Sequence, residues 1–205
     1  MTIKVCGMRD AENIREVEAL GIDMIGFIFW PKSKRYVSEK PEYLPVSCKR
    51  VGVFVDKSIE QVKHIADDYA LDIIQLHGSE SPDFARRLRS VCGDTIATIK
   101  AFNIATKEDL EATKPYEGIV DYFLFDTKGQ SVGGNGEKFD WSVLEAYDGQ
   151  TPFLLSGGIG PDDAERVKAF LHPKCIGIDL NSRFEISPGF KDVNKLREFI
   201  KKIRI

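Results

Sequence analysis

Eight short apolar runs recur along the chain, and longer segments with a helical pattern of apolar residues lie between most of them. Eight runs in 205 residues give about 26 residues per unit, the size of one strand with its helix and loops. The expected strands are Ile3–Met8, Met24–Phe29, Arg50–Val55, Ile73–His77, Thr95–Phe102, Tyr122–Asp126, Phe153–Ser156 and Ile176–Leu180. The expected helices are Ala11–Leu20, Ile59–Tyr69, Asp83–Val91, Lys107–Lys114, Pro161–Leu171 and Val193–Ile203.

This alternation predicts a parallel sheet, because parallel neighbours must be joined by a crossover. An open doubly wound sheet and a closed eight-stranded barrel both satisfy it. A dinucleotide-binding open sheet favours G-x-G-x-x-G after an early strand, whereas the first run here leads into Cys6-Gly7-Met8-Arg9-Asp10. The count of eight therefore favours an α/β fold of the (β/α)8 TIM-barrel type. No Pro- or Ser-rich linker divides the chain, so we expect one catalytic domain over residues 1–205.

Charge and composition exclude several classes of protein. The net charge is −3 and no long block of Lys or Arg occurs, so we expect no nucleic-acid partner. The densest apolar stretch, Met24 to Trp30, is too short to span a membrane, and we see no secretory signal at the N-terminus. The four cysteines (Cys6, Cys48, Cys92 and Cys175) form no C-x-x-C motif, which predicts no structural zinc and favours a reducing cytoplasm.

Two loops are candidates for binding a phosphate. In such barrels the site lies at the carboxyl ends of the strands, and phosphate often binds after strands seven and eight. The seventh expected strand runs into Ser156-Gly157-Gly158-Ile159-Gly160, and the eighth into Asp179-Leu180-Asn181-Ser182-Arg183. Glycine amides, a hydroxyl and a cation together suit an anion. The alternative is a tight Gly-Gly turn followed by an Asn-Ser helix cap.

Cys6 and Asp126 are candidates for proton transfer, because each ends an apolar strand. In a closed ring, strands one and six lie three steps apart, so the two side chains would flank one small substrate. Lys4 shares a strand face with Cys6, and we expect it to pair with Asp179 and to favour the Cys6 thiolate. The alternative for Cys6 is a small buried hydrophobe.

Arg35 and His77 lie in or next to strand-end loops. The Arg35 guanidinium could hold a carboxylate through two hydrogen bonds, although a solvated basic loop is the usual outcome for Lys32-Ser33-Lys34-Arg35. His77 ends the fourth expected strand, and its alternative is a core or loop histidine. No H-E-x-x-H, P-loop or G-x-S-x-G motif occurs, so zincins, Walker NTPases and serine hydrolases have no support.

A series of short motifs runs in order along nearly the whole chain. The motifs are Lys4-Val5-Cys6-Gly7-Met8, Gly26-Phe27, Lys34-Arg35-Tyr36, Val51-Gly52-Val53-Phe54-Val55, Gln75-Leu76-His77-Gly78, Lys100-Ala101, Asp126-Thr127, Gly133-Gly134-Asn135-Gly136, Phe139-Asp140-Trp141, Ser156-Gly157-Gly158 and Pro188-Gly189-Phe190-Lys191-Asp192. Each is weak by itself. Their combination is specific and resembles the phosphoribosylanthranilate isomerase family of tryptophan biosynthesis.

The resemblance implies an Amadori rearrangement of N-(5-phosphoribosyl)anthranilate, an aminoaldose, to the corresponding 1-deoxyribulose 5-phosphate, without a metal or an organic cofactor. It places the general acid on Asp126 and the general base on Cys6. It also implies that Arg35 meets the anthranilate carboxylate. The remaining implied residues contact the substrate (His77, Asp179) or its phosphate (Gly157, Gly158, Asn181, Ser182).

Two further features of the chain bear on substrate binding. Arg183 stands where the family usually has glycine, so it is either strained, if that glycine had a positive φ, or an added cation for the phosphate. Residues 129–138 contain four glycines, and we expect them to close over the substrate as a lid.

Two other functions stay open from the sequence. One is another phosphosugar isomerase or epimerase, which would use strand-end His and Asp residues to hold a metal. The other is a catalytically silent barrel that binds phosphosugars. The expected partner is a small phosphosugar-anthranilate substrate, and the expected assembly is a monomer or a homodimer.

Overall fold

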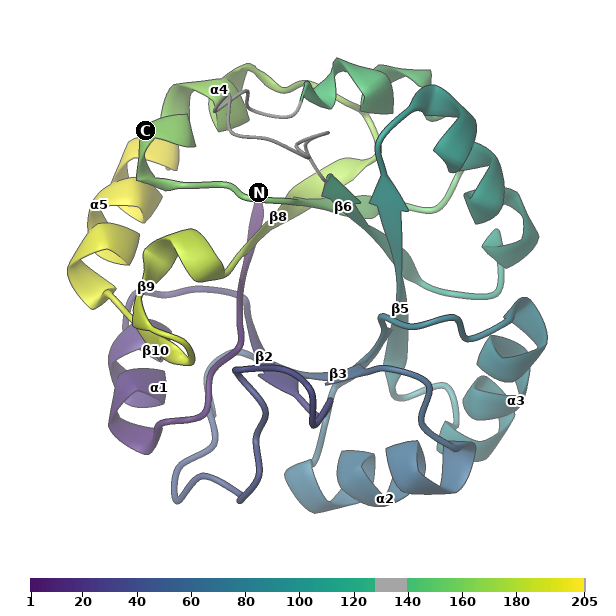
Figure 1. Ribbon diagram of the computed structural model, residues 1–205, viewed down its shortest axis with the longest axis horizontal. Coiled ribbons are helices and arrows are strands. Elements are labelled where there is room, and N and C mark those ends of the chain that lie inside the picture. Colours follow the sequence, from purple (N-terminus) through teal and green to yellow (C-terminus); the bar gives the residue numbers. More distant parts are fainter. Residues whose placement is uncertain (128–139, 205) are drawn as a thin grey trace.

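The computed structural model describes residues 1–127 and 140–204, and its eight main strands close into a parallel barrel in chain order (Figure 1). The strands are β1 (Thr2–Cys6), β2 (Met24–Ile28), β3 (Lys49–Phe54), β4 (Ile73–Leu76), β5 (Ala97–Ile104), β6 (Tyr122–Thr127), β7 (Phe153–Ser156) and β8 (Cys175–Leu180). β1 pairs with both β2 and β8, which closes the ring. The predicted barrel is confirmed, and the expected strand boundaries agree to within two residues.

Helical segments surround the ring (Figure 1). The α-helices are α1 (Ala11–Glu18), α2 (Ile59–Tyr69), α3 (Pro82–Cys92), α4 (Ala164–Ala169) and α5 (Val193–Ile203). The 3-10 helices are η1 (Lys107–Tyr116), η2 (Trp141–Ala146), η3 (Pro161–Asp163) and η4 (Ser182–Phe184). None of the helices within the described residues is long and apolar enough to cross a membrane.

Two of the expected helices were wrong in type or length. The segment expected as a helix over Lys107–Lys114 is 3-10 and runs to Tyr116, because Pro115 disfavours α-helical backbone at the residue before it. The expected helix Pro161–Leu171 begins as 3-10 and ends at Ala169. Phe170 is already extended, and Pro173 follows shortly afterwards.

The barrel interior is filled by one apolar layer with a polar layer above it. The apolar layer consists of Met24, Val51, Ile73, Ile99, Leu124 and Leu154. Because side chains two residues apart share a strand face, the next inward positions on β4, β6 and β7 are Gln75, Asp126 and Ser156. The apolar layer therefore closes the barrel below and leaves polar side chains at the carboxyl ends of the strands.

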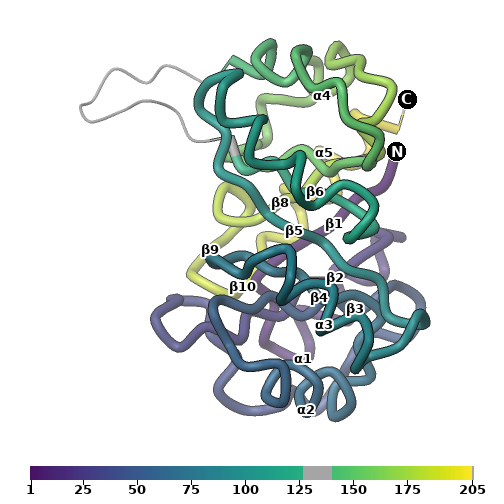
Figure 2. The backbone as a smooth tube through the Cα atoms, turned by 90° about the vertical axis from the view of Figure 1, so that its right-hand side faces the viewer, coloured from purple at the N-terminus to yellow at the C-terminus, as the bar shows by residue number. Residues whose placement is uncertain are grey.

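A short antiparallel hairpin that the sequence did not predict follows β8. It consists of β9 (Glu185–Ser187) and β10 (Phe190–Lys191). The side view places this hairpin toward the carboxyl ends of the strands, whereas the N-terminus enters from the opposite end (Figure 2).

Lys4 and Asp179 form a buried ion pair between β1 and β8. They are register partners, and Lys4 Nζ lies 2.8 Å from Asp179 Oδ1, with side chains 0% and 8% exposed. Burial is the largest influence and opposes the charge on Lys4, but the attractions and hydrogen bonds of Asp179 and Cys6 together outweigh it, and the pKa of Lys4 is raised above its ordinary value. The predicted pairing is confirmed.

Breaking this pair is expected to destabilise the fold. A Lys4→Met variant leaves the Asp179 carboxylate buried without its counter-charge, so the free energy of unfolding should fall by about 3–5 kcal/mol. Lys114→Met breaks an exposed pair with Glu111 and should leave the free energy of unfolding close to the wild-type value, because solvent screens such pairs. Urea unfolding of both variants measures the difference, and equal losses would contradict the account.

Candidate active site

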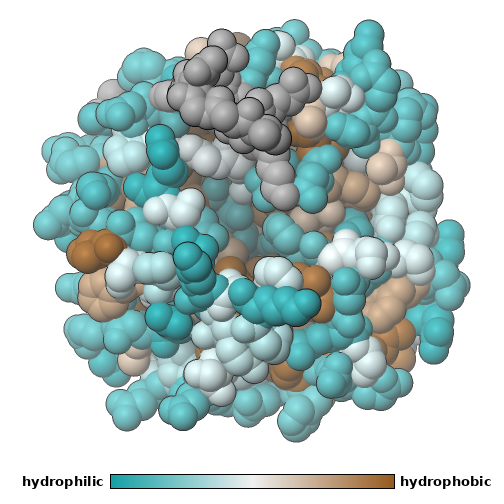
Figure 3. Space-filling view, in the orientation of Figure 1, coloured by the Kyte–Doolittle hydropathy of each residue, from teal (hydrophilic) through white to brown (hydrophobic). Residues whose placement is uncertain are grey.

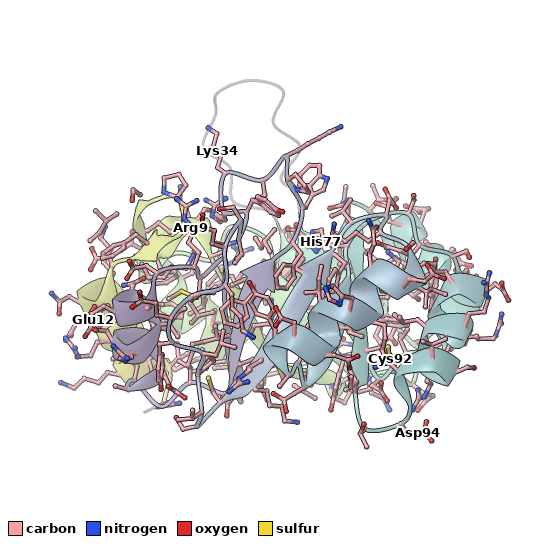
Figure 4. The ribbon with its side chains drawn as sticks, turned by 90° about the horizontal axis from the view of Figure 1, so that it is seen from below. Arg9, Glu12, Lys34, His77, Cys92 and Asp94 are labelled. Atoms are coloured by element: carbon pink, nitrogen blue, oxygen red, sulfur yellow. The ribbon has the colours of Figure 1, made fainter. Side chains whose placement is uncertain are left out.

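A cavity of about 280 Å³ opens at the carboxyl ends of the strands. Figure 3 looks onto this face, which is hollowed near its centre. Figure 4 places Arg9, Lys34 and His77 at this end of the barrel and Asp94, which precedes β5, at the other. The cavity lining includes every predicted site residue except Arg35, namely Cys6, His77, Asp126, Gly157, Gly158, Asp179, Asn181 and Ser182.

Cys6 and Asp126 enter the cavity from separate parts of the ring. Cys6 ends β1 and Asp126 lies in β6, with β7 and β8 between them. The Cys6 side chain depends on Gly26 of β2, since a Cβ added there would lie 2.7 Å from the Cys6 sulfur. The sequence motif Gly26-Phe27 contains this glycine, but its contact with Cys6 could not be predicted from the sequence.

The protonation of Cys6 differs from the expectation. Burial raises the pKa of the Cys6 thiol, Lys4 and Lys191 lower it, and Asp179 raises it further, so that the net pKa lies above the ordinary value. The expected preference for the thiolate is wrong for the free protein. Lys4 is paired with Asp179, whose negative charge acts on the sulfur in the opposite direction to Lys4, and burial is the largest influence.

Alkylation of Cys6 by iodoacetamide is therefore expected to be slow at neutral pH. Only the thiolate reacts, so the rate should increase with pH and reach half its plateau above the ordinary thiol value of about 8.5. Peptide-resolved mass spectrometry separates Cys6 from the three other cysteines. A midpoint below the ordinary value would contradict the raised pKa.

The loop after β7 has backbone that only glycine adopts readily. Gly157 and Gly158 have φ values of 96° and 73°. Within the part of the chain that the structure describes, no atom outside the adjacent residues lies within 4 Å of a Cβ added at Gly158, so the requirement there is conformational. On the neighbouring strand, Asn181 Oδ1 accepts a hydrogen bond of 2.8 Å from Lys191 Nζ. These two loops form one polar wall of the cavity.

His77 lies between Gln75 and Asp126. Gln75 Nε2 is 2.9 Å from His77 Nδ1, and His77 Nε2 is 4.0 Å from Asp126 Oδ2. Gln75 is 1% exposed and lines the cavity, although sequence reasoning assigned it no role. The sequence could have indicated this position, because Gln75 lies two residues before His77 and therefore on the same face of the strand.

Comparison with known proteins identifies the family of the chain. Residues 3–202 match the profile described as N-(5'phosphoribosyl)anthranilate (PRA) isomerase. The chain belongs to this family. Two relatives named N-(5'-phosphoribosyl)anthranilate isomerase come from Parabacteroides distasonis and Phocaeicola vulgatus. The first relative is 54% identical, and the alignment covers 99% of this chain and 93% of the relative. The second is 48% identical, and the alignment covers 100% of this chain and 98% of the relative.

Solved structures of phosphoribosylanthranilate isomerases have the same fold. One, in complex with reduced 1-(o-carboxyphenylamino)-1-deoxyribulose 5-phosphate, aligns with a TM-score of 0.83 at 31% identity, covering 100% of this chain and 98% of that one. The Thermotoga maritima enzyme gives the same values. A 3-hexulose-6-phosphate synthase at 12% identity and a TM-score of 0.62 shares the fold alone.

Arg35, in an isomerase-family motif, is held by a carboxylate of the protein itself. Its Nε and Nη2 lie 2.8 and 2.6 Å from the two oxygens of Glu185, and Glu185 Oε1 also accepts from Lys191 Nζ at 2.6 Å. Burial opposes the Glu185 charge, but the bonds from Arg35 and Lys191 outweigh it, and the pKa of Glu185 is lowered. Lys191 stands in one of the motifs shared with the family, yet no sequence pattern connected Lys191 or Glu185 to Arg35.

The remaining family comparisons concern Arg183 and the lid. Arg183 does not have a positive φ, so the expected alternative of backbone strain is wrong. A Cβ added at Gly160 would lie 3.4 Å from Arg183 Nε, which places the Arg183 side chain along the β7 loop. The expected lid over residues 129–138, including Asn135, lies outside the described residues.

Proposed function

We propose that Cys6 is the general base and Asp126 the general acid of this chain. The reaction is the isomerisation of N-(5'-phosphoribosyl)anthranilate in tryptophan biosynthesis, the activity of the family. One observation carries the assignment: Cys6 and Asp126 line one cavity from strands three steps apart, beside a glycine loop with positive φ. A small substrate in this cavity meets one proton-transfer group on each side.

The proton transfers follow from this placement. Asp126 donates its proton to the furanose ring oxygen as the C1–O bond breaks, and the nitrogen lone pair forms the C1=N double bond of a Schiff base. Because its pKa is raised, Cys6 is a thiol in the free protein and must first lose its proton to solvent. The thiolate so formed then removes the C2 proton, so that a C1=C2 double bond forms and the nitrogen regains its electron pair. The resulting enolamine gains a proton at C1 and loses one from the C2 hydroxyl, which gives the ketone.

The two ends of the substrate fit two different walls. The phosphate lies against Gly157, Gly158, Asn181 and Ser182, where amides and a hydroxyl face the cavity. The aromatic ring lies against the apolar wall from the ends of β2 and β3, formed by Ile28, Trp30, Val53 and Val55. His77 and Asp179 contact the sugar between these ends.

Arg35 binds the anthranilate carboxylate through the part of its guanidinium that Glu185 leaves available. Glu185 accepts from Nε and Nη2, so both Nη1 protons and one Nη2 proton face away from it. The Arg35 side chain is 22% exposed. It packs against Gly7, the residue that follows Cys6, since a Cβ added at Gly7 would lie 2.6 Å from Arg35 Cδ. Glu185 thus fixes the orientation of the Arg35 guanidinium group at the edge of the site.

An Arg35→Lys variant is expected to raise KM by about 10- to 100-fold with a smaller change in kcat. Lysine keeps the charge but cannot make the planar pair of bonds, and a bond to a charged group is worth about 1.5–3 kcal/mol. Lys32→Ala removes an exposed charge from the same loop and should leave KM unchanged. Steady-state kinetics decides, and equal effects of both substitutions would contradict a role for Arg35.

The proposed substrate class, domain organisation, cellular location and assembly of the chain go with the same assignment. The chain acts on a small-molecule phosphosugar as one catalytic domain over residues 1–205, in the cytoplasm, as a monomer or a homodimer. One solved relative, the Thermotoga maritima enzyme, is described as dimeric, and monomers have been generated from it. Among the described residues, no group of three or more His, Cys, Asp or Glu side chains is arranged to hold a metal ion.

Product identification tests the proposed function. Chelator-treated protein is incubated with N-(5'-phosphoribosyl)anthranilate, and NMR follows the ribose C1 and C2 signals. The proposal predicts conversion of the aminoaldose into the aminoketose at rates far above the uncatalysed reaction. Binding of the reduced product analogue without conversion would instead identify a silent phosphosugar-binding barrel.

A further inference from the structure

Gln75 contains an unsatisfied atom at the floor of the cavity. Its Oε1 is buried and has no hydrogen-bond partner among the described residues, whereas its Nε2 lies 2.9 Å from His77 Nδ1. A buried polar atom without a partner costs about 1–3 kcal/mol. An amide retained at such a cost, in a residue that lines the cavity, indicates a role other than packing.

The contact with Gln75 determines which nitrogen of His77 carries the proton. An amide NH2 group can only donate, so Nδ1 of the neutral ring must accept, and the ring proton lies on Nε2. The opposite amide orientation would leave an NH2 group, with two donors, where Oε1 now lies without a described partner. It would also turn the Nε2 lone pair toward the Asp126 carboxylate, 4.0 Å away.

We propose that Gln75 is a positioning residue that directs the Nε2–H of His77 at Asp126, an inference that rests on the proposed function of Asp126 as general acid. When Asp126 gives its proton to the sugar, a negative charge develops on its carboxylate. The Nε2–H dipole stabilises this charge, whereas the other tautomer presents a lone pair to it. The 4.0 Å separation in the free protein exceeds a hydrogen bond, and such contacts often tighten when substrate binds.

The tautomer can be measured without turnover. The chain has only three histidines, His64, His77 and His172, so 15N-labelled histidine gives few signals. The variants His64→Gln and His172→Gln assign the His77 ring by elimination. At about pH 8, above the ordinary histidine pKa, the wild-type protein should show the His77 proton on Nε2. A proton on Nδ1 would overturn the proposal.

Two substitutions at Gln75 connect the tautomer to the rate. In Gln75→Glu the carboxylate only accepts, so the His77 proton should move to Nδ1 and kcat should fall by about 100-fold with little change in KM. Gln75→Met keeps the length and the packing but frees the ring, so the proton should divide between both nitrogens and kcat should fall by about tenfold. Gln150→Glu, on the exposed surface, is the matched control and should change neither.

Each outcome separates this proposal from its alternatives. A Gln75→Glu variant with the proton on Nδ1 and the wild-type kcat would overturn it. So would a Gln75→Met variant that loses as much kcat as Gln75→Glu while its proton stays on Nε2, because packing would then explain the loss. If Gln75→Glu fails to fold, Gln75→Met carries the test. A folded wild-type protein without isomerase activity would contradict the proposed function instead.

Discussion

An Asp126→Asn variant is expected to lose about 10²- to 10⁴-fold of kcat, the contribution typical of a positioned acid or base. The amide has nearly the shape of the carboxyl group but cannot give a proton to the ring oxygen, so the furanose stays closed. Asp126 ends an apolar strand and its side chain is 27% exposed, so the substitution should not disturb the barrel.

The control for this variant is Asp162→Asn, which neutralises an exposed carboxylate after β7 at the same end of the barrel. It should keep the wild-type kcat. Both variants should bind the reduced product analogue as the wild type does, because neither residue is assigned to the phosphate or the carboxylate. An Asp126→Asn variant that turns over normally would remove Asp126 from the mechanism.

A Cys6→Ser variant is expected to lose kcat to a similar extent, about 10²- to 10⁴-fold. The serine hydroxyl fits the space that Gly26 leaves for the sulfur, but it has no accessible anionic form with which to remove the C2 proton. The fold should be unchanged, because the hydroxyl group is smaller than the thiol and displaces no neighbouring atom.

Cys48→Ser is the matched control for the thiol. Cys48 precedes β3 at the opposite end of the barrel, and burial raises the pKa of its thiol to about 12. Its replacement should leave kcat unchanged. Retention of wild-type kcat in Cys6→Ser would keep the isomerase and discard Cys6 as its base.

The features that the sequence predicted correctly depend on short periods. Strand–helix alternation fixed the order of the ring, and the two-residue strand period placed Lys4 and Cys6 on one face. The pairing of Lys4 with Asp179 then followed, because β1 and β8 must meet when the ring closes. Residues at strand ends were predicted to share one cavity for the same reason.

The features that were missed depend on contacts between distant segments or on burial. Arg35 and Glu185 are 150 residues apart, and no local pattern predicts that one of them holds the other. The raised pKa of Cys6 needs the burial of the sulfur and the offsetting charges of Lys4 and Asp179, which appear only after the barrel closes. The 3-10 form of η1 follows from Pro115, a local signal that the apolar periodicity obscured.

Turnover of N-(5'-phosphoribosyl)anthranilate at saturating concentration tests the central claim most directly, with wild-type, Cys6→Ser and Asp126→Asn proteins measured side by side. Circular dichroism and binding of the reduced product analogue establish that all three are folded and have an intact site. The account predicts rapid conversion by the wild type and a loss of at least about 100-fold in each variant. Wild-type protein that binds the analogue without turnover, or full activity in either variant, would contradict it.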